Sequence, residues 1–409
     1  MPRRVVITGR GIVSCIGNHL DEVAAALKAA RSGIRRAPEF AEAGLRSQIA
    51  GVPALDSLPA VPRALRRFMA DTALYAYHAA SAAIAEARLD SGLLASSRTA
   101  LIVGSGVSSS LEIADNVALA RSGGARKVLP YAVPRLMGST TSANLATAFG
   151  VRGPSYSIVS ACASSSHSIG HGAELIQLGK AERVIAGGAE EASWTTALMF
   201  DAMGALSSGY NDRPQAASRP YDARRDGFVL SGGAGIVVLE ELESALARGA
   251  RPLAELVGYG TSSDGADMVA PSVDGIACAM RAALDEARVS TIDYINTHAT
   301  STPSGDLVEL KALQDVFGER LPPFSSTKGL TGHAIAASGA QESIYCLLMM
   351  ERGFVAGSAN LEDPDPALAG LPIVRTAREA RLATVMTNSL GFGGTNASLI
   401  LRQWRDAPG

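Results

Sequence analysis

The sequence predicts an α/β fold built from two similar halves that meet near residue 250. Short apolar runs alternate with alanine-rich stretches along the whole chain, the pattern of strands alternating with helices in α/β folds. The length, 409 residues, exceeds what one hydrophobic core normally organises. A strand, a tight turn and a helix of small residues also occur once in each half. Duplication is therefore the preferred interpretation, although two unrelated α/β halves would give a similar pattern.

The first half, residues 1–250, is expected to alternate strands and helices from its N-terminus. Its strands are predicted from short apolar runs, at 5–7, 101–103, 156–159, 183–185 and 236–239. Its helices are predicted from alanine-rich or amphipathic stretches, at 21–30, 73–87 and 240–248.

The second half, residues 251–409, restarts the pattern after Arg251-Pro252, since proline does not continue a helix. The segment 322–333 leads through an elbow into a small-residue helix that ends near Met350. No linker or low-complexity segment interrupts the chain. The strands are predicted at 254–257, 384–386 and 397–401.

Composition argues against several classes of protein. The net charge of −2 and the 5% of aromatic residues disfavour a nucleic-acid-binding module, which needs a basic, aromatic-bearing face. Four scattered cysteines form no C-x-x-C pair, so neither a disulfide framework nor a zinc site is expected. The N-terminus reaches glycine too early for a signal peptide, and the longest apolar stretch, 344–350, is too short to span a bilayer. We therefore expect a soluble cytoplasmic protein whose partners include neither nucleic acid nor membrane.

Cys162 is the first candidate for chemistry. It lies in Ser160-Ala-Cys-Ala-Ser, between a predicted strand and a predicted helix of small residues. Unpaired N–H groups at a helix N-terminus carry partial positive charge, which lowers the pKa of a nearby thiol. The sequence therefore predicts a cysteine nucleophile on an elbow. An inert core cysteine is the alternative, since free cysteines are among the most buried residues.

Two of the six histidines are further candidates. His298 ends a predicted strand in a turn rich in hydroxyl residues, and His333 lies at the second strand-to-helix elbow. Ligands in α/β sheets bind beyond the carboxyl ends of strands, so both histidines are expected to converge with Cys162. For each histidine alone, a buried structural role is the alternative. The i,i+4 pair His167 and His171 favours packing over metal binding, because no third ligand accompanies it.

The glycine-rich segment 388–396 is a third candidate. A tight turn between strands is one interpretation, and a phosphate loop is disfavoured because the Lys-Ser/Thr ending is absent. Its glycines could instead bring a backbone N–H close to a reacting carbonyl, as part of an oxyanion hole.

Five motifs together resemble the β-ketoacyl-[acyl-carrier-protein] synthase family over essentially the whole chain. Within that family, the segments 200–206 and 263–271 most resemble the type I elongating synthases of bacterial fatty acid synthesis. In chain order, the motifs are Ser160-Ala-Cys-Ala-Ser, Arg219-Pro-Tyr-Asp-x-x-Arg-Asp-Gly-Phe228, Asn296-x-His-x-Thr-x-Thr-Pro-x-Gly-Asp306, Lys328-x-x-Thr-Gly-His333 and Gly391-Phe-Gly-Gly-Thr-Asn396.

The resemblance implies a thiolase-like fold, with duplicated halves stacked as a five-layered αβαβα sandwich, and an obligate homodimer. The first half carries the nucleophile and the second half carries the two histidines. The implied reaction is the decarboxylative condensation of an acyl group with a malonyl group, both carried by acyl carrier protein, to give a 3-oxoacyl product and CO₂. No metal or diffusible cofactor is implied, because the substrates arrive on the phosphopantetheine arm of the carrier.

The same resemblance implies roles for individual residues. Cys162 forms the acyl thioester, while His298 and His333 bind the malonyl carbonyl and stabilise the enolate. The backbone N–H groups of Cys162 and Phe392 hold the oxyanion, and the Phe392 ring gates the acyl pocket. Neutral donors suit an enolate, because water would protonate the carbanion or hydrolyse the thioester. Lys328 and Glu342 are implied to orient the histidines. Thr300 and Thr302 are implied to bind pantetheine.

Three residues depart from the family pattern. Ala299 and Ala336 replace glycines, and each adds a methyl group to a closely packed region near a histidine. Met199 replaces a glutamate expected beside the acyl pocket, so the preferred chain length and unsaturation stay open.

The resemblance also implies that the carrier protein is acidic. A basic patch that binds it is therefore expected around the mouth of the substrate tunnel. A solvated surface without function is the alternative, since exposed charges usually contribute little. If the patch does bind the carrier, salt should weaken the interaction. Its candidates are Arg63, Arg66, Arg67, Arg126 and Lys127.

Particular residues separate most alternative functions from this one. A non-catalytic chain-length partner of polyketide systems lacks the nucleophilic cysteine, whereas Cys162 is present. A thiolase has a second cysteine in its C-terminal glycine loop, and 391–396 has none. A condensing enzyme of the Cys-His-Asn type lacks the Thr-Gly-His setting of His333. A polyketide or aryl-polyene ketosynthase has the same chemistry, so that alternative stays open.

Overall fold

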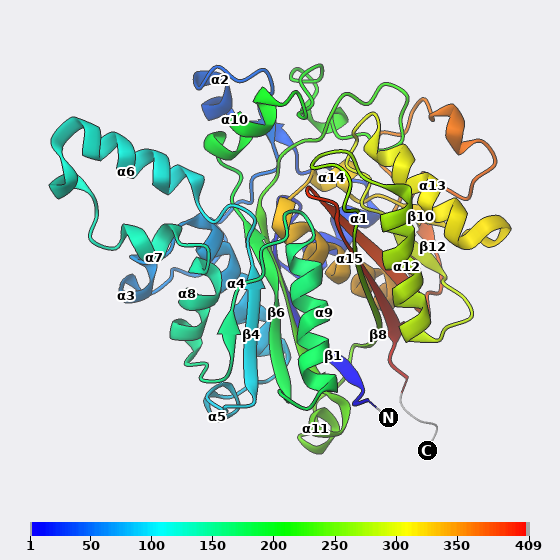
Figure 1. The fold of residues 1–409 in the computed structure, drawn as a ribbon, viewed down its shortest axis with the longest axis horizontal. Helices are drawn as coiled ribbons and strands as arrows, with labels where there is room; N and C mark the ends of the chain where they lie inside the picture. Colours follow the sequence, from blue (N-terminus) through cyan, green and yellow to red (C-terminus); the bar gives the residue numbers. More distant parts are fainter. Residues whose placement is uncertain (1, 406–409) are drawn as a thin grey trace.

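The computed structural model describes residues 2–405, and ten strands form one continuous sheet (Figure 1). The first half supplies β1 (Val5–Val13), β4 (Thr99–Gly104), β5 (Ser155–Tyr156), β6 (Arg183–Glu190) and β7 (Gly233–Glu241). The second half supplies β8 (Ala254–Ser263), β9 (Tyr294–Asn296), β10 (Phe324–Ser325), β13 (Thr384–Gly391) and β14 (Thr395–Gln403).

The two halves repeat one topology, which confirms the predicted duplication. Their strand orders are β1-β7-β6-β4-β5 and β8-β14-β13-β9-β10, so each half follows the order first, fifth, fourth, second, third. The first two pairings of each series are antiparallel and the last two are parallel. The halves join where β1 runs antiparallel to β8, at the pairs Val6–Glu255 and Ile7–Ala254.

Helices separate and cover the two halves of the sheet. The helices that form layers are α4 (Asp71–Glu86), α8 (Thr140–Phe149), α9 (Ser164–Gln177), α12 (Val273–Ala287), α13 (Gly305–Phe317) and α15 (Ser338–Arg352). α9 and α15 contact each other and strands of both halves, so they form a central layer within the largest apolar core. α4 and α8 cover the outer face of the first half, and α12 covers that of the second with α13 beside it (Figure 1). This is the predicted five-layered, thiolase-like sandwich.

Shorter elements connect these layers. The remaining α-helices are α1 (Leu20–Lys28), α2 (Pro38–Glu42), α3 (Arg63–Arg66), α5 (Ser91–Leu94), α6 (Ser110–Gly123), α7 (Ala132–Leu136), α10 (Trp194–Ala202), α11 (Leu242–Ala247) and α14 (Lys328–Thr331). The 3₁₀ turns are η1 (Ala125–Lys127), η2 (Pro214–Ala216), η3 (Gly318–Arg320), η4 (Ile335–Ala337) and η5 (Pro366–Leu368). Two small sheets pair β2 (Arg35–Arg36) with β3 (Ile49–Ala50), and β11 (Phe354–Val355) with β12 (Arg378–Glu379). In Figure 1, α6 projects from the body on the side of α7 and α3.

Glycines let the outer helices lie directly on the sheet, in the same way in both halves. A Cβ at Gly11 of β1 would lie 1.9 Å from the Ala79 carbonyl oxygen of α4. A Cβ at Gly260 of β8 would lie 1.9 Å from the Ala279 carbonyl oxygen of α12. These distances leave no room for a side chain, so close packing requires glycine at both positions.

All but one of the predicted strands lie inside observed ones. The prediction for 156–159 is wrong, because β5 ends at Tyr156 and the chain then leaves the sheet for the Cys162 elbow. Val159 is 58% exposed there, so its β-branched side chain does not report a buried strand. The small-residue helix predicted after His333 begins only at Ser338, after the turn η4. Within residues 2–405, no helix is both long and apolar enough to span a bilayer.

We predict that Gly11→Ala destabilises the protein, because its methyl group would overlap backbone atoms of α4. Overpacking of this kind lowers the free energy of unfolding by about 1–3 kcal/mol. Gly138→Ala is the matched control, since a Cβ there meets nothing within 4 Å. Denaturant unfolding of both variants checks the prediction, and equal midpoints would contradict it.

Candidate active site

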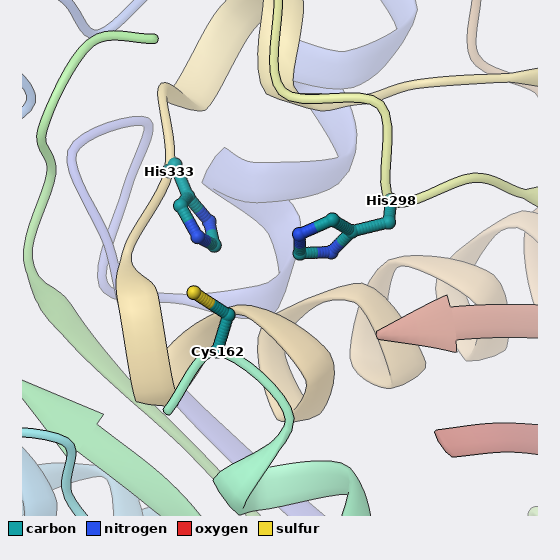
Figure 2. A group of neighbouring side chains, drawn as sticks. All are labelled: Cys162, His298 and His333. Carbon is teal, nitrogen blue, oxygen red and sulfur yellow. The ribbon is translucent and has the colours of Figure 1, made fainter. Parts of the chain in front are cut away.

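Three side chains far apart in the sequence meet at one point of the fold (Figure 2). Cys162 lies just before α9, His298 follows β9, and His333 follows α14. The Cys162 Sγ and the nearest ring nitrogens of both histidines all lie within 4.8 Å of one another. The two imidazole centroids are 5.1 Å apart and the rings are perpendicular, at 90°. Figure 2 shows the sulfur pointing toward the two rings.

A strained turn presents Cys162. Ala161, the preceding residue, has a φ of +48°, which non-glycine residues rarely adopt and which the surroundings must stabilise. The Ser164 hydroxyl does so in part, because it accepts from the Ser160 N–H at 2.9 Å and donates to the Ala161 carbonyl at 2.6 Å. The thiol of Cys162 receives backbone hydrogen bonds from its own N–H and from that of Phe392. Two backbone N–H groups therefore lie beside the sulfur, the kind of donors that the carbonyl oxygen of an acyl group on Cys162 would need.

The prediction of a lowered pKa for Cys162 is wrong for the free protein. Burial raises the pKa of this thiol to about 12, and the Glu190 carboxylate acts in the same direction. The Lys328 charge and the two backbone amides lower it, but they do not outweigh the loss of solvent. The resting residue is therefore a neutral thiol that must lose its proton when it reacts.

Both imidazoles are neutral and available to a ligand. Burial, the Lys328 charge and, for His298, the neighbouring histidine lower their pKa values well below the usual range. His333 Nδ1 hydrogen-bonds the Ser338 hydroxyl at 2.9 Å. In the described part of the chain, His298 Nδ1 and His333 Nε2 are buried without a partner. Buried polar atoms normally have partners, so these nitrogens mark a place for substrate atoms.

A buried ion pair accounts for part of this electrostatic setting. Lys328, at the start of α14, pairs with Glu342 of α15, and both side chains are almost fully buried. Burial raises the pKa of Glu342 to about 7, against the opposing effect of Lys328. The ammonium disfavours a second positive charge on either imidazole, as a nearby like charge does.

Glu309 is a site residue that sequence reasoning missed. It lies on α13, and its carboxylate accepts the backbone N–H groups of His298 at 2.9 Å and Ala299 at 2.8 Å. Asn388 Nδ2 donates to it at 3.2 Å. Burial raises the pKa of Glu309 to about 7. No motif marked this acid, and its spacing three residues beyond Asp306 was the only available signal.

A cavity of about 410 Å³ leads from the surface to these residues. Thr300 and Thr302 lie along it, with their hydroxyl oxygens 3.3 Å apart. The residues lining it include Cys162, Phe200, Met203, Phe228, Val269, His298, Ala299, Glu309, His333, Ile335 and Phe392. Its lining is mainly apolar with some polar side chains, as small-molecule sites usually are.

Aromatic rings connect the gate position with the histidines. Phe392 is 37% exposed, and its ring lies 6.2 Å from that of Phe200. Phe200 contacts Phe228 edge to face at 5.2 Å, and Phe228 contacts His333 in the same way at 5.6 Å. Met199, expected beside the acyl pocket, is 65% exposed on α10 and does not line the cavity in the described chain.

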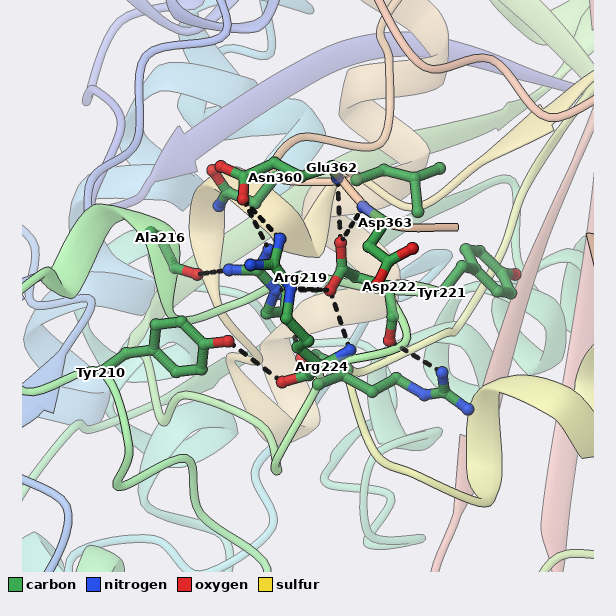
Figure 3. Close-up of polar contacts among 12 residues, drawn as sticks. Tyr210, Ala216, Arg219, Tyr221, Asp222, Arg224, Asn360, Glu362 and Asp363 are labelled. Carbon is green, nitrogen blue, oxygen red and sulfur yellow. Dashed lines mark hydrogen bonds and ion pairs between the residues drawn. The ribbon is translucent and has the colours of Figure 1, made fainter. Parts of the chain in front are cut away.

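The motif at 219–228 forms a buried polar network beside the cavity (Figure 3), and its last three residues, 226–228, line the cavity itself. The Arg219 guanidinium donates to Asp222 at 3.0 Å and lies 4.9 Å from the centroid of the Tyr210 ring. The Asp222 carboxylate also accepts the backbone N–H groups of Glu362 and Asp363. A segment of the first half is thereby held to one of the second half.

The same motif supports the loop that carries His298. Arg225 donates to the carbonyl oxygens of Thr302 at 2.9 Å and Pro303 at 2.5 Å. Asp306 accepts the Tyr221 backbone N–H at 2.9 Å and lies 3.7 Å from the Arg225 guanidinium. The conformation of this loop therefore depends on residues of both halves.

The donor set at Cys162 could in principle hold a metal ion, because the sulfur and two imidazoles form a compact triangle. The buried ammonium of Lys328 acts on both histidines and on the thiol. Its positive charge opposes a dication at the same place. The residues therefore fit a neutral organic ligand better than a metal. His167 and His171 make separate contacts, to Ser160 and to Tyr156 respectively.

The five basic residues expected at a carrier patch lie outside the cavity lining. Three are on or next to α3 and two are in η1. Arg66 is half-buried and forms a 3.8 Å ion pair with Asp71, while the other four are exposed. The ring contact between Phe68 and Tyr131, at 5.9 Å, brings the segments after α3 and η1 together.

Known proteins resemble this chain over nearly its full length. The family model "Beta-ketoacyl synthase, N-terminal domain" matches residues 2–245, and "Beta-ketoacyl synthase, C-terminal domain" matches residues 253–362. A 3-oxoacyl-[acyl-carrier-protein] synthase 1 of Haemophilus influenzae is 52% identical over 407 residues, covering 98% of this chain and 99% of that protein. A β-ketoacyl synthase structure from Burkholderia phymatum superposes with a TM-score of 0.94 at 39% identity, covering 98% and 100% of the two chains. A ketosynthase in complex with its type II PKS acyl-carrier protein superposes with a TM-score of 0.91 at 28% identity, covering 99% and 100%.

We predict that Arg225→Met destabilises the protein strongly, because it leaves the fully buried Asp306 without its cation. Breaking a buried pair lowers the free energy of unfolding by about 3–5 kcal/mol. The matched control is Arg224→Met, since the Arg224 side chain is 53% exposed and exposed pairs contribute at most about 1 kcal/mol. Thermal and urea unfolding measure the stability of the two variants. Equal losses of unfolding free energy would contradict the importance of the Arg225–Asp306 pair.

We predict that alkylation of Cys162 by iodoacetamide accelerates steadily with pH. With a thiol pKa of about 12, the reactive thiolate remains a small fraction between pH 7 and pH 9. The rate should therefore rise about tenfold per pH unit over this range. Intact mass against time gives the rate, with Cys162→Ala reporting alkylation elsewhere. A plateau near pH 7 would show instead that the helix N-terminus and the amides dominate.

Proposed function

The chain belongs to the β-ketoacyl synthase family, and from this premise we propose that it is a 3-oxoacyl-[acyl-carrier-protein] synthase of fatty acid elongation. It joins an acyl group to a two-carbon unit from malonyl-carrier protein, with an acyl-Cys162 thioester as intermediate. The 52% identity to the Haemophilus synthase, over 98% of this chain and 99% of that protein, supports this elongating role. The geometric support is the meeting of a nucleophilic sulfur, two neutral imidazoles and two backbone amides at the end of one cavity.

Acyl transfer uses the thiol and the two amides. The acyl carbonyl oxygen points at the N–H groups of Cys162 and Phe392, and the sulfur attacks the carbonyl carbon. The thiol proton leaves, and the departing pantetheine sulfur of the carrier is protonated, so the free carrier thiol is released. Each amide donor is worth about 2.7–4 kcal/mol of transition-state stabilisation by comparison with other oxyanion holes.

Decarboxylation uses the two histidines. The malonyl thioester oxygen accepts hydrogen bonds from His298 and His333, whose neutral rings can each donate one. The C–C bond to the carboxylate breaks, CO₂ leaves, and the electron pair becomes an enolate held by these donors. The enolate carbon then attacks the acyl carbonyl on Cys162, whose sulfur leaves and regains a proton. Thr300 and Thr302 hold the pantetheine arm along the cavity, and neither a metal nor a diffusible cofactor takes part.

We propose a homodimer that works in the cytoplasm. β5 is an edge strand whose two residues are exposed, and unpaired edges are sites of strand pairing. Val159, three residues after β5, is 58% exposed. Val133 of α7 and Met199 of α10, two helices that both contact α6, are 67% and 65% exposed. An open strand edge with large exposed apolar side chains nearby supports a subunit interface at this face.

A polyketide or aryl-polyene ketosynthase is the second candidate. The polyketide ketosynthase with bound carrier protein shares the fold at 28% identity, well below the identity to the fatty acid synthase. The shape of the acyl pocket decides between the two. A non-catalytic chain-length partner is disfavoured, because Cys162 is present between its two amide donors.

The test of this function is a two-step mass measurement. The protein is incubated with octanoyl-carrier protein, its intact mass is recorded, and malonyl-carrier protein is then added. We expect an octanoyl adduct on the wild type, none on Cys162→Ala, and a 3-oxodecanoyl product after the second step. Absence of both the adduct and malonyl decarboxylation would overturn the proposal. An adduct only with other starter groups would favour the polyketide candidate.

We predict that the basic patch sets affinity for the carrier rather than turnover. Charge reversal by Arg63→Glu with Arg126→Glu should raise KM for malonyl-carrier protein about tenfold, because charged surface residues act mainly on association. Turnover at saturation should stay unchanged, and added salt should raise the KM of the wild type toward that of the variant. Arg320→Glu, exposed in η3 beyond α13, is the matched control. An equal effect of both changes on KM would remove the patch from the carrier interface.

A further inference from the structure

His167 is a buried histidine that the proposed reaction does not use. It lies on α9, five residues after Cys162, and is only 8% exposed. Its Nδ1 lies 2.6 Å from the Ser160 hydroxyl and its Nε2 lies 3.0 Å from the Thr261 hydroxyl. It also forms a hydrogen bond to the backbone of Asn396. Both ring nitrogens of this buried side chain therefore have hydrogen-bond partners.

These partners belong to the two sides of the oxyanion hole. Ser160 starts the strained turn that ends at Cys162, whereas Thr261 and Asn396 lie on β8 and β14. β14 follows directly on the turn that carries Phe392. His167 is thus hydrogen-bonded on one side to the turn that carries the Cys162 amide. On the other side it is hydrogen-bonded to β14, the strand that follows the turn with the Phe392 amide.

The two segments are packed too closely to adjust independently. A Cβ at Gly391 would lie 2.9 Å from the Ser160 carbonyl oxygen and 3.3 Å from the Cys162 nitrogen. Burial lowers the pKa of His167, so its ring is neutral and has one donor and one acceptor nitrogen. Such a ring can link a hydroxyl on one side to a polar group on the other with a fixed separation.

We infer that His167 is a positioning residue that holds the Cys162 turn against the β13–β14 turn and thereby sets the spacing of the two oxyanion-hole amides. This inference rests on the proposed function. It predicts a selective effect on the reaction. Acyl transfer uses both amides, whereas malonyl decarboxylation in the absence of an acyl group uses His298 and His333.

The test measures these two partial reactions separately. Octanoyl transfer from its carrier protein to Cys162 is followed by intact mass, and CO₂ release from malonyl-carrier protein is followed without an acyl donor. His167→Leu should slow acyl transfer about ten- to a hundredfold, the loss expected for an ångström of misplacement, while decarboxylation changes less than about threefold. His171→Leu is the matched control one turn along α9, since His171 contacts Tyr156 and Glu174 but not the turn.

Two conservative variants keep the inference testable if His167→Leu does not fold. His167→Asn places a polar atom near the position of Nδ1 and keeps the Ser160 contact, whereas His167→Gln reaches the position of Nε2 and keeps the Thr261 contact. Because each variant keeps only one end of the link, both should slow acyl transfer about tenfold or more, while decarboxylation stays within about threefold of the wild type.

Three results would overturn the inference. They are wild-type acyl transfer in either His167→Asn or His167→Gln, a parallel loss of both partial reactions with a lowered melting temperature, or unchanged acyl transfer in His167→Leu. Failure of the proposed function looks different, because the wild type itself would then perform neither partial reaction.

Discussion

The close packing of α9 against α15 between the two halves of the sheet is the constraint on which the site depends. Small residues make it possible: a Cβ at Gly339 would lie 2.1 Å from the Ser166 hydroxyl oxygen, and the Ala340 N–H donates to Ser165 Oγ at 2.9 Å. Because each helix follows the elbow of its own half, this contact brings the two elbows together. Duplication therefore creates a site that neither half has alone, with the sulfur from one and the imidazoles from the other.

Burial at that point shifts the pKa values of acids and bases in opposite directions. It raises the pKa of the Cys162 thiol and lowers the pKa values of both imidazoles, so all three groups are neutral at rest. The Lys328–Glu342 pair adds a positive charge that further opposes protonation of the histidines. A neutral, water-poor site of this kind suits a reaction whose intermediate is a carbanion, because every unneeded proton would end it.

Supports of the site extend well beyond the cavity. The 219–228 motif of the first half holds the loop of the second half that carries His298, and Glu309 fixes the two backbone amides at its start. These groups act on the imidazole through the backbone of its loop, and Glu309 also lines the cavity. Catalytic geometry is sensitive to displacements of about an ångström, which explains why so much buried polar structure surrounds three reactive side chains.

The sequence by itself determined most of the long strands, several helices, the two elbows, and the candidacy of Cys162, His298 and His333, because these depend on local patterns of apolar, small and polar residues. It did not mark α8, α12 or α13. It also misled where local pattern and environment disagree, as at 156–159, where β-branched residues leave the sheet, and at Cys162, whose thiol pKa is raised rather than lowered. Glu309 and the long-range contacts of His167 were visible only in the tertiary structure, since partners such as Thr261, Asn388 and Asn396 lie 79 or more residues away. Desolvation and long-range hydrogen bonds depend on which segments pack together, and no short stretch of sequence contains that information.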